Sequence, residues 1–305
     1  MNNESLQPFE IQREALAERL NLREQWESQV KILNETGILE ILPEAQELGI
    51  IGIDGREHPV PDFQEIMSRI SPEQMEVLEK KNEQGFNKMV LVPFAVPLDI
   101  LIDRYKKLLI EKDAEGSLSS TDGSKLNLDR DQPIYVWDKY TGADASGELV
   151  YFPNTFDQQN HGGKTKNTLI QEGKSWQFEL LEENINIPAK GQGEILDGRK
   201  QLEAGQSPNQ YLKELQIDPQ YQNEVGLTPE AWLVLAITQL KENHGQIDDY
   251  QGQGKINFLT GAYFPGSDSV PRARWSRDGR RAFLDRSVPS GSLSSIGCRS
   301  SVEIQ

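Results

Sequence analysis

The chain has 305 residues, 36% of them hydrophobic, and its formal net charge is −16 at pH 7. This length allows two domains or one large one. The acidic excess argues against the chain as a whole binding nucleic acid or an anionic membrane surface. No apolar run approaches the length that crosses a bilayer, residues 1–5 lack the basic and apolar regions of a signal peptide, and the single cysteine cannot form an internal disulfide. We therefore expect a cytoplasmic protein, with unconventional export as the alternative.

Residues 1–85 are predicted to form a helical module rich in Glu and Gln. Apolar side chains three to four positions apart indicate helices, and Ser71-Pro72 is typical of a capped helix start. The expected elements are a helix over residues 8–34, a strand over 49–53, a helix over 62–70, and a helix from Ser71 to about Gly85. The module is either an oligomerisation or docking element, or an extension that only packs on the main domain.

Residues 86–305 are predicted to form the main domain, of the α+β class. The expected strands cover residues 88–94, 133–137, 149–152 and 176–180, and extended segments cover 247–250 and 256–264. The expected helices begin near Leu98, Ser207 and Thr228. Loops are expected over residues 113–131 and 157–168. Apolar and polar residues alternate over 176–180, which predicts a half-exposed strand. Strands and helices do not alternate regularly, so the order favours α+β over a parallel α/β sheet.

The sequence offers little support for phosphate, metal or cofactor binding. Gly163-Lys164-Thr165 has the end of a phosphate loop, but Gln158 stands where its first glycine is needed. The histidines lie far apart in sequence without metal spacing, and one cysteine excludes zinc clusters. Asp248-Asp249 either helps to hold a divalent cation or is a solvated acidic pair. We expect no metal and no cofactor.

The segment over residues 257–302 differs from everything before it. It contains no Glu, Lys or Gln, and arginine supplies all of its positive charge. The bland interpretation is a terminal loop or tail. However, its spaced apolar residues are not needed in a solvated tail; they include Trp275, Phe283, Leu284, Leu293, Ile296 and Val302. We expect a folded segment with its polar side chains facing outward, in which Cys298 is a small buried hydrophobe rather than a nucleophile.

The runs Trp275-Ser276-Arg277-Asp278-Gly279-Arg280-Arg281-Ala282 and Ser295-Ile296-Gly297-Cys298-Arg299-Ser300-Ser301-Val302 carry a resemblance. They resemble the end of C-type lectin folds of the formylglycine-generating-enzyme type, which close on a Gly-x-Arg strand, here Gly297-Cys298-Arg299. Within that superfamily, residues 86–305 look most similar to the variable proteins of diversity-generating retroelements. The resemblance does not cover residues 1–85.

This resemblance implies a ligand-binding protein whose surface residues are diversified by adenine-directed mutagenesis. Asparagine codons can then become Ser, Gly, Arg, Asp, Val, Leu, Phe or Ile, but not Lys, Glu, Gln, Met or Trp. The absence of Lys, Glu, Gln and Met from residues 257–302 agrees with that. The pair of reactive cysteines that formylglycine-generating enzymes need is missing, because Cys298 is the single cysteine. The sequence also lacks Glu-Pro-Asn and Gln-Pro-Asp, the usual signatures of calcium-dependent sugar binding.

We therefore predict a rigid lectin-type scaffold with a changeable outward patch within residues 257–302, not an enzyme, that binds a variable ligand, most simply a protein. The expected frame positions are Trp275, Ala282, Leu284, Ile296, Gly297, Arg299 and Val302. The expected ligand contacts are Arg272, Arg274, Asp278, Arg280, Phe283, Asp285, Arg286, Ser287, Val288, Ser290, Ser292, Leu293 and Ser295, each of which is otherwise an ordinary exposed loop residue. The alternatives are an enzyme of the same fold with non-cysteine chemistry, and a structural subunit that residues 1–85 assemble.

Overall fold

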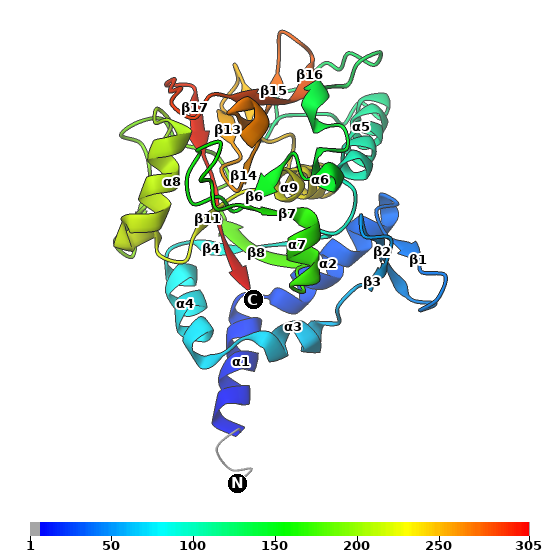
Figure 1. The fold of residues 1–305 in the computed structure, drawn as a ribbon, viewed down its shortest axis with the longest axis vertical. Helices are drawn as coiled ribbons and strands as arrows, with labels where there is room; N and C mark the ends of the chain where they lie inside the picture. Colours follow the sequence, from blue (N-terminus) through cyan, green and yellow to red (C-terminus); the bar gives the residue numbers. More distant parts are fainter. Residues whose placement is uncertain (1–6, 305) are drawn as a thin grey trace.

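The computed structural model describes residues 7–304, so the segment over residues 1–5, in which the sequence predicts no signal peptide, lies outside it. The fold is α+β, as expected, with several sheets and helices on both sides of them (Figure 1). The helices are α1 (Gln7–Arg19), α2 (Leu22–Glu35), α3 (Phe63–Arg69), α4 (Pro72–Glu83), α5 (Leu98–Ala114), α6 (Ala143–Ser146), α7 (Lys166–Gln171), α8 (Pro208–Ile217) and α9 (Pro229–Lys241).

Within residues 7–304, the strands belong to five sheets. They are β1 (Glu40–Ile41), β2 (Leu48–Ile51), β3 (Glu57–Pro59), β4 (Phe86–Val92), β5 (Ile134–Val136), β6 (Val150–Tyr151), β7 (Lys164–Thr165), β8 (Gln177–Glu182), β9 (Ile195–Leu196), β10 (Arg199–Lys200), β11 (Val225–Gly226), β12 (Asp249–Tyr250), β13 (Ile256–Phe258), β14 (Ala262–Tyr263), β15 (Val270–Ser276), β16 (Arg281–Ser287), β17 (Ile296–Cys298) and β18 (Ser300–Ile304).

The single helix that we predicted over residues 8–34 is wrong, because the chain breaks between α1 and α2. Asn21 takes a left-handed conformation, with φ of 50°, and its side chain donates to Glu24 Oε2 at 2.7 Å. Asparagine tolerates this conformation better than most residues, because its short polar side chain can bond locally. The apolar spacing that suggested one helix therefore continues across a turn and serves two helices that meet at an angle (Figure 1).

The other N-terminal elements follow the prediction. Asp62 and Ser71 cap α3 and α4 by accepting hydrogen bonds from the backbone amides three residues later. A small antiparallel sheet of β1, β2 and β3 contains the predicted strand. Apolar residues of this part belong to the same continuous core as those of the later chain. The packing on the main body that we gave as one alternative is therefore present, and the oligomerisation role stays a prediction.

Glutamine side chains of α2 dock this part on the edge of the four-stranded sheet, whose order is β11-β18-β8-β4. Gln25 Nε2 donates to the carbonyl of Asn87 at 2.8 Å, and Gln25 Oε1 accepts from the amide of Met89 at 2.7 Å. Because β4 is the last strand of the sheet, its outer backbone groups would otherwise lack partners. The Gln-rich composition that marked the N-terminal part is thus used in part to cover a strand edge.

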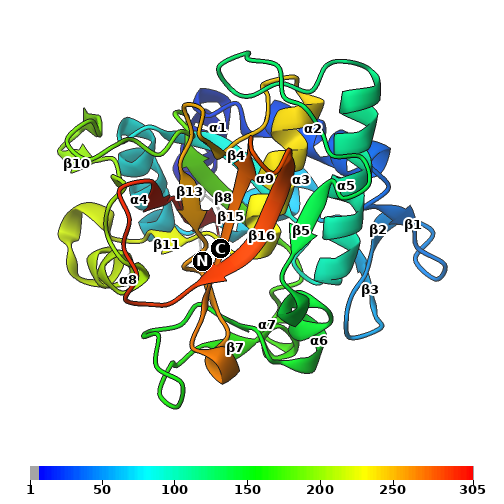
Figure 2. The same ribbon diagram turned by 90° about the horizontal axis from the view of Figure 1, so that it is seen from above.

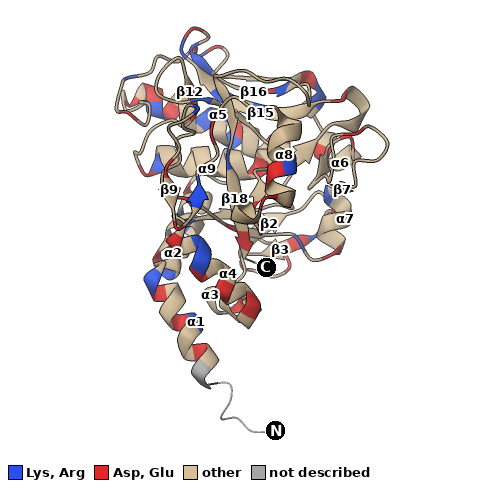
Figure 3. Cartoon of the chain, turned by 90° about the vertical axis from the view of Figure 1, so that its left-hand side faces the viewer, with Lys and Arg blue, Asp and Glu red and all other residues tan. Residues whose placement is uncertain are grey.

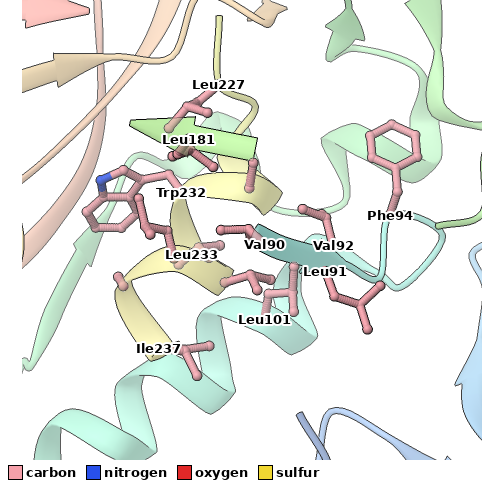
Figure 4. Packing of buried hydrophobic residues seen from close by; sticks show 14 of the residues in the cluster. Val90, Leu91, Val92, Phe94, Leu101, Leu181, Leu227, Trp232, Leu233 and Ile237 are labelled. Carbon is pink, nitrogen blue, oxygen red and sulfur yellow. The ribbon is translucent and has the colours of Figure 1, made fainter. Parts of the chain in front are cut away.

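Our prediction of a half-exposed strand at residues 176–180 is wrong, since β8 is buried on both faces. It lies between β4 and β18, and even Gln177 and Glu179 are almost fully covered. Helices α2 and α4 contact this sheet, and so does α9. Figure 4 shows side chains of β4 beside Leu233 of α9 and Leu101 of α5. The polar residues that alternate with apolar ones along β8 are therefore buried in the protein interior and do not form a solvated face.

A six-stranded sheet forms the top of the molecule in Figure 1. Five of its strands have the order β17-β13-β15-β16-β5, and the sixth, β12, pairs with β15 in parallel. Its long hairpin pairs β15 with β16 antiparallel, and β5 joins β16 in parallel. Helix α9, buried along nearly its whole length, lies beneath this sheet when the molecule is seen from above (Figure 2). The loop that we predicted over residues 157–168 is partly wrong, because β7 and the start of α7 fall within it.

Candidate ligand-binding face

Strands β15 and β16 give the terminal segment two different faces. Along β15, Ala273 and Trp275 are sealed inside, whereas Arg272 and Arg274 are only partly buried; along β16, Ala282 and Leu284 are inside. Side chains of a strand alternate between faces, and the register places Arg274 opposite Phe283 and Arg272 opposite Asp285. We call the group Tyr135, Arg272, Arg274, Phe283 and Asp285 the outer face.

One carboxylate holds both arginines of the outer face. Arg272 donates through Nε to Asp285 Oδ1 and through Nη2 to Oδ2 at 3.1 Å, while Arg274 Nη1 donates to Oδ2 at 2.8 Å. Two guanidinium groups thus share a single negative charge. The outer face retains an excess of positive charge in a protein that is strongly acidic as a whole. Charges of both signs lie close together around β15 and β16 (Figure 3).

Aromatic rings form the second component of the outer face. The Tyr135 and Phe283 rings lie 5.3 Å apart between centroids, and the Arg274 guanidinium lies 4.3 Å above the Phe283 ring. Such stacking limits the freedom of the arginine, whose side chain remains 15% exposed. Guanidinium groups recognise carboxylates, phosphates and aromatic faces, so this surface is suited to a partner that offers those groups.

The remaining predicted contacts lie at the two ends of the hairpin. Asp278 and Arg280 are exposed in the turn between β15 and β16, where Asp278 accepts a hydrogen bond from Gln251 Nε2. At the other end, Arg286 stacks on the Trp137 ring at 4.9 Å, away from Phe283. The following residues lie in or beside the loop between β16 and β17 and are exposed or half-buried: Ser287, Val288, Ser290, Ser292, Leu293 and Ser295. We call residues 288–295 the terminal loop.

Exposed apolar side chains stand out in the terminal loop. Val288 is 50% exposed and Leu293 is 60% exposed. The loop is tied down at both ends, because the Pro289 carbonyl accepts from the amide of Asn209 at the start of α8 and the Ser295 carbonyl accepts from the amide of Ile256. Two apolar groups are therefore held at the surface by an anchored loop, and each offers apolar area to a partner.

The frame positions predicted from sequence are all buried, and Arg299 explains how the segment is locked. Its guanidinium donates to Asp248 Oδ1 at 2.7 Å and, through Nε, to the carbonyl of Ile185 at 2.8 Å. Trp232 Nε1 also donates to Asp248, at 2.7 Å. A buried arginine needs partners for its charge and donors, and these supply them. The arginine thereby joins the last strands to α9 and to the segment after β8.

Both of our interpretations of Asp248 and Asp249 need correction. They are neither solvated nor a cation site, because each is almost fully buried against an arginine. Asp249 accepts from Arg277 Nε at 3.0 Å, and hydrogen bonding to this carboxylate raises the pKa of Arg277. Within residues 7–304, no cluster of His, Cys, Asp and Glu is arranged to hold a metal ion. The acidic pair therefore serves to hold the terminal segment.

Other reactive groups considered from sequence have structural surroundings. Cys298 is buried, and this burial raises the pKa of its thiol to about 12, so it stays protonated near neutral pH. Lys164 pairs with Glu172 at 2.7 Å, and the Thr165 side chain caps α7. The Gly163-Lys164-Thr165 stretch therefore uses its functional groups within the chain.

Sequence analysis missed contributors from outside residues 257–302. Tyr135 and Trp137 come from β5 and the residue after it, and they lie against Phe283 and Arg286 respectively. The alternation within Ile134-Tyr135-Val136 gave a signal, since it places Tyr135 on the face opposite its neighbours. Which side of the sheet that face lies on depends on the parallel pairing of β5 with β16, which no local pattern indicates.

Comparisons with known proteins identified no relative of this chain. No family model matches it, and neither a curated protein nor a solved structure shows significant similarity. In addition, no helix within residues 7–304 combines the length and apolarity required to cross a bilayer.

Proposed function

We propose that this protein binds ligands through the outer face and the terminal loop, and that these surfaces change while the frame beneath them stays fixed. The observation that carries this proposal is the alternation of burial over residues 272–275 of β15 and 282–285 of β16. Residues predicted to contact a ligand are at least partly exposed, and the frame residues interleaved with them are sealed inside. Substitution on such a face leaves the packing below it intact.

The diversified variable proteins of C-type lectin fold remain our proposed family. Support comes from the composition of residues 257–302, which lack the amino acids that adenine-directed change of asparagine codons cannot produce, apart from the buried Trp275. Further support comes from the Gly297-Cys298-Arg299 stretch, because its arginine is buried and locks the chain end. A frame fixed in this way limits the ordering cost that binding would otherwise carry.

The ligand that suits this surface best is a protein. The outer face combines arginine with aromatic rings, which are enriched where proteins meet, and its charged side chains are 13–23% exposed. Exposed Val288 and Leu293 would add apolar area at its edge. The site has no fixed specificity in this proposal, because each diversified variant would present other side chains.

The flanking DNA provides the direct test of diversification. We expect a near-copy of the coding region for residues 257–302 that differs only at adenines, next to a gene for a reverse transcriptase. The differences should fall on the outward codons and spare those of Trp275, Ala282 and Leu284. Differences spread equally over inward and outward codons would refute the proposal.

Binding itself is tested by display of two libraries on the full chain. One randomises Arg272, Arg274, Phe283 and Asp285; the control randomises the exposed residues Asp103, Lys106, Lys107 and Glu111 of α5. Selection against a purified test protein should yield binders with micromolar or better affinity, about −8 kcal/mol, from the first library only. Equal yields from both libraries would contradict a dedicated face.

A further inference from the structure

A buried lysine at the start of α7 contacts two carboxylates at once. Lys166 Nζ lies 2.7 Å from Asp144 Oδ2, in α6, and 2.8 Å from Glu230 Oε1, in α9. The side chains of Lys166 and Glu230 are fully buried, and that of Asp144 is 2% exposed. None of the three residues belongs to the outer face or to the terminal loop, so this cluster is independent of the proposed function.

Each carboxylate of the cluster is fixed by a donor of its own. The backbone amide of Leu98 donates to Asp144 Oδ2 at 2.8 Å, and the Tyr151 hydroxyl donates to Glu230 Oε1 at 2.7 Å. These donors come from the start of α5 and from β6, so three separate parts of the chain hold the two carboxyl groups on either side of the amine. The arrangement is therefore built into the fold and does not depend on one flexible side chain.

The amine itself lies in surroundings that exclude water. Its Nζ donates to the carbonyl of Val96 at 2.9 Å and lies 5.3 Å from the centroid of the Phe94 ring and 5.9 Å from that of the Tyr151 ring. Both rings are fully buried. The charged end of Lys166 is thus enclosed by aromatic rings and by the two carboxylates, without contact with solvent.

Burial makes the cluster costly as long as its groups are charged. Two carboxylates and one ammonium carry one negative charge in excess, and charges that have lost their water are destabilising unless they are fully paired. An amide bond between the amine and one carboxyl group would replace an ammonium and a carboxylate with a neutral group. Because Cγ of Asp144 is bonded to Oδ2, it lies at most about 4 Å from Nζ. Reaction requires about 3–3.5 Å between these two atoms, which a small shift of the lysine chain provides.

A second buried lysine shows that contact with a carboxylate is not sufficient. Lys81 Nζ lies 2.5 Å from Glu224 Oε1, and their side chains are 4% and 0% exposed. However, Arg199 donates to both oxygens of that carboxylate, at 2.6 and 2.7 Å. Because arginine keeps its proton, it holds Glu224 as an anion, which an amine does not attack. Within residues 7–304, Asp144 has no arginine partner.

We propose that Lys166 and Asp144 join through an isopeptide bond, with Glu230 as the residue that moves the proton. Lys166 passes one proton to the Asp144 carboxylate, which leaves a neutral amine beside a carboxylic acid. Nζ then attacks Cγ, forms the N–C bond and releases a second proton to Glu230. Glu230 returns that proton to the departing hydroxyl oxygen, the C–O bond breaks, and one water leaves. The ammonium and the carboxylate thus become an amide and a water, and nothing is oxidised or reduced.

The bond would connect α6 to α7, which contact each other in the fold (Figure 2). It closes the segment over residues 145–165 into a covalent loop, which restricts the unfolded chain in the way that a disulfide does. Strand β6 lies in this loop and pairs with β14 of the terminal segment. The chain's lone cysteine cannot supply an internal disulfide, so the isopeptide bond would be a covalent cross-link of a different kind.

Intact mass spectrometry of the denatured full chain tests the proposal. We expect a mass that is lower than that of the sequence by one water molecule. After trypsin digestion, residues 140–164 should appear joined to residues 165–174, because trypsin does not cleave after an acylated lysine. Fragmentation of this product should place the link between Asp144 and Lys166.

Variants then assign the roles within the cluster. Lys166→Met removes the nucleophile and Glu230→Gln removes the proton acceptor, so each should have the full mass of its own sequence. Lys81→Met removes the other buried lysine and is the matched control, which should keep the loss of one water. Thermal unfolding verifies that each variant is folded, and the wild-type digest decides the proposal even where a variant does not fold.

Three results would contradict the proposal. A wild-type mass equal to that of the sequence would identify the cluster as an ordinary buried ion network. A loss of water that digestion assigns to an Asp-Gly pair, where a succinimide forms, would overturn the isopeptide bond as well. A link that persists in folded Glu230→Gln would refute the role of Glu230 in moving the proton.

Discussion

The two faces of the β15–β16 hairpin share a backbone but differ in what holds their side chains. On the inner face, Trp275 and Leu284 are completely covered by the core. On the outer face, Arg272, Arg274 and Asp285 are held by hydrogen bonds to one another, and their side chains remain 23%, 15% and 13% exposed. The hairpin therefore places a fully buried layer directly beneath a partly exposed one, and the same segment can support both stability and change.

The largest difference between the faces should appear on truncating an aromatic residue. Trp275→Ala should lower the free energy of unfolding by about 3–5 kcal/mol, because it leaves a large cavity in a packed core. Phe283→Ala, on the outer face of β16, should lower the free energy of unfolding by only about 1 kcal/mol, because the ring is already partly in solvent. Urea denaturation of both variants measures the two losses, and losses of equal size would show that the outer face is part of the core.

Arginines of the two environments allow a second comparison. Arg299→Met leaves the buried carboxylate of Asp248 without its counter-charge and should cost about 3–5 kcal/mol of unfolding free energy. Arg272→Met leaves Asp285 paired with Arg274 at a partly exposed site and should cost about 0–1 kcal/mol. The same denaturation experiment decides this, and a larger loss for Arg272→Met would contradict the assignment of frame and face.

A buried carboxyl group in the four-stranded sheet sharpens the comparison through pH. Burial raises the pKa of Glu179 from 4.5 to about 7. Below pH 4.5 the group is neutral in both the folded and unfolded protein; between 4.5 and 7 only the unfolded protein releases the proton, so stability falls as pH rises through this window. Glu179→Gln, which is neutral throughout, should match the wild type near pH 4.5 and exceed it by up to about 3 kcal/mol above pH 7.

Thermal unfolding of wild type and Glu179→Gln across this pH range measures the effect. The exposed Glu76→Gln is the control and should show no pH-dependent gain. A constant difference between Glu179→Gln and the wild type at all pH values would mean that the pKa of Glu179 is the same in the folded and the unfolded protein.

A smaller loss of stability is expected when one methyl group is added at Gly297, near the end of the frame. A Cβ at Gly297 would lie 2.4 Å from Ile187 Cγ2 and 3.2 Å from the Ala204 Cα, so Gly297→Ala should cost about 1–3 kcal/mol through overpacking. Ser292→Ala in the exposed terminal loop should change stability by less than about 0.5 kcal/mol. Chemical denaturation of this pair would contradict the account if Ser292→Ala were the more damaging change.

The helix starts could be predicted from sequence, because a capping residue acts on backbone amides only a few positions away. Ser207 and Gln210 form the reciprocal cap that their spacing suggests, and Thr228 caps α9. The break at Asn21 was missed because apolar spacing continues across it. The burial of β8 was missed because it depends on layers that come from both ends of the chain.

In the candidate site too, local features could be predicted from sequence and long-range contacts could not. The exposure of residues 272–275 and 282–285 follows from alternation along two strands and could be predicted, whereas Arg286 is exposed although it has the same parity as the buried Leu284. The arginine partners of Asp248 and Asp249 could not, since Arg299 and Arg277 come close to them only after the sheet has formed. Tyr135 was missed for the same reason, because a parallel pairing over a long separation brings it to Phe283.

The central claim is that the outer face can change while the frame cannot. It is tested most directly by measuring the folded fraction in two libraries of the full chain, sorted for protease resistance. One randomises Arg272, Arg274, Phe283 and Asp285, and the other randomises Ala273, Trp275, Ala282 and Leu284 on the same strands. We predict that most members of the first library stay folded and that few of the second do. Equal loss of folded protein in both libraries would contradict the account.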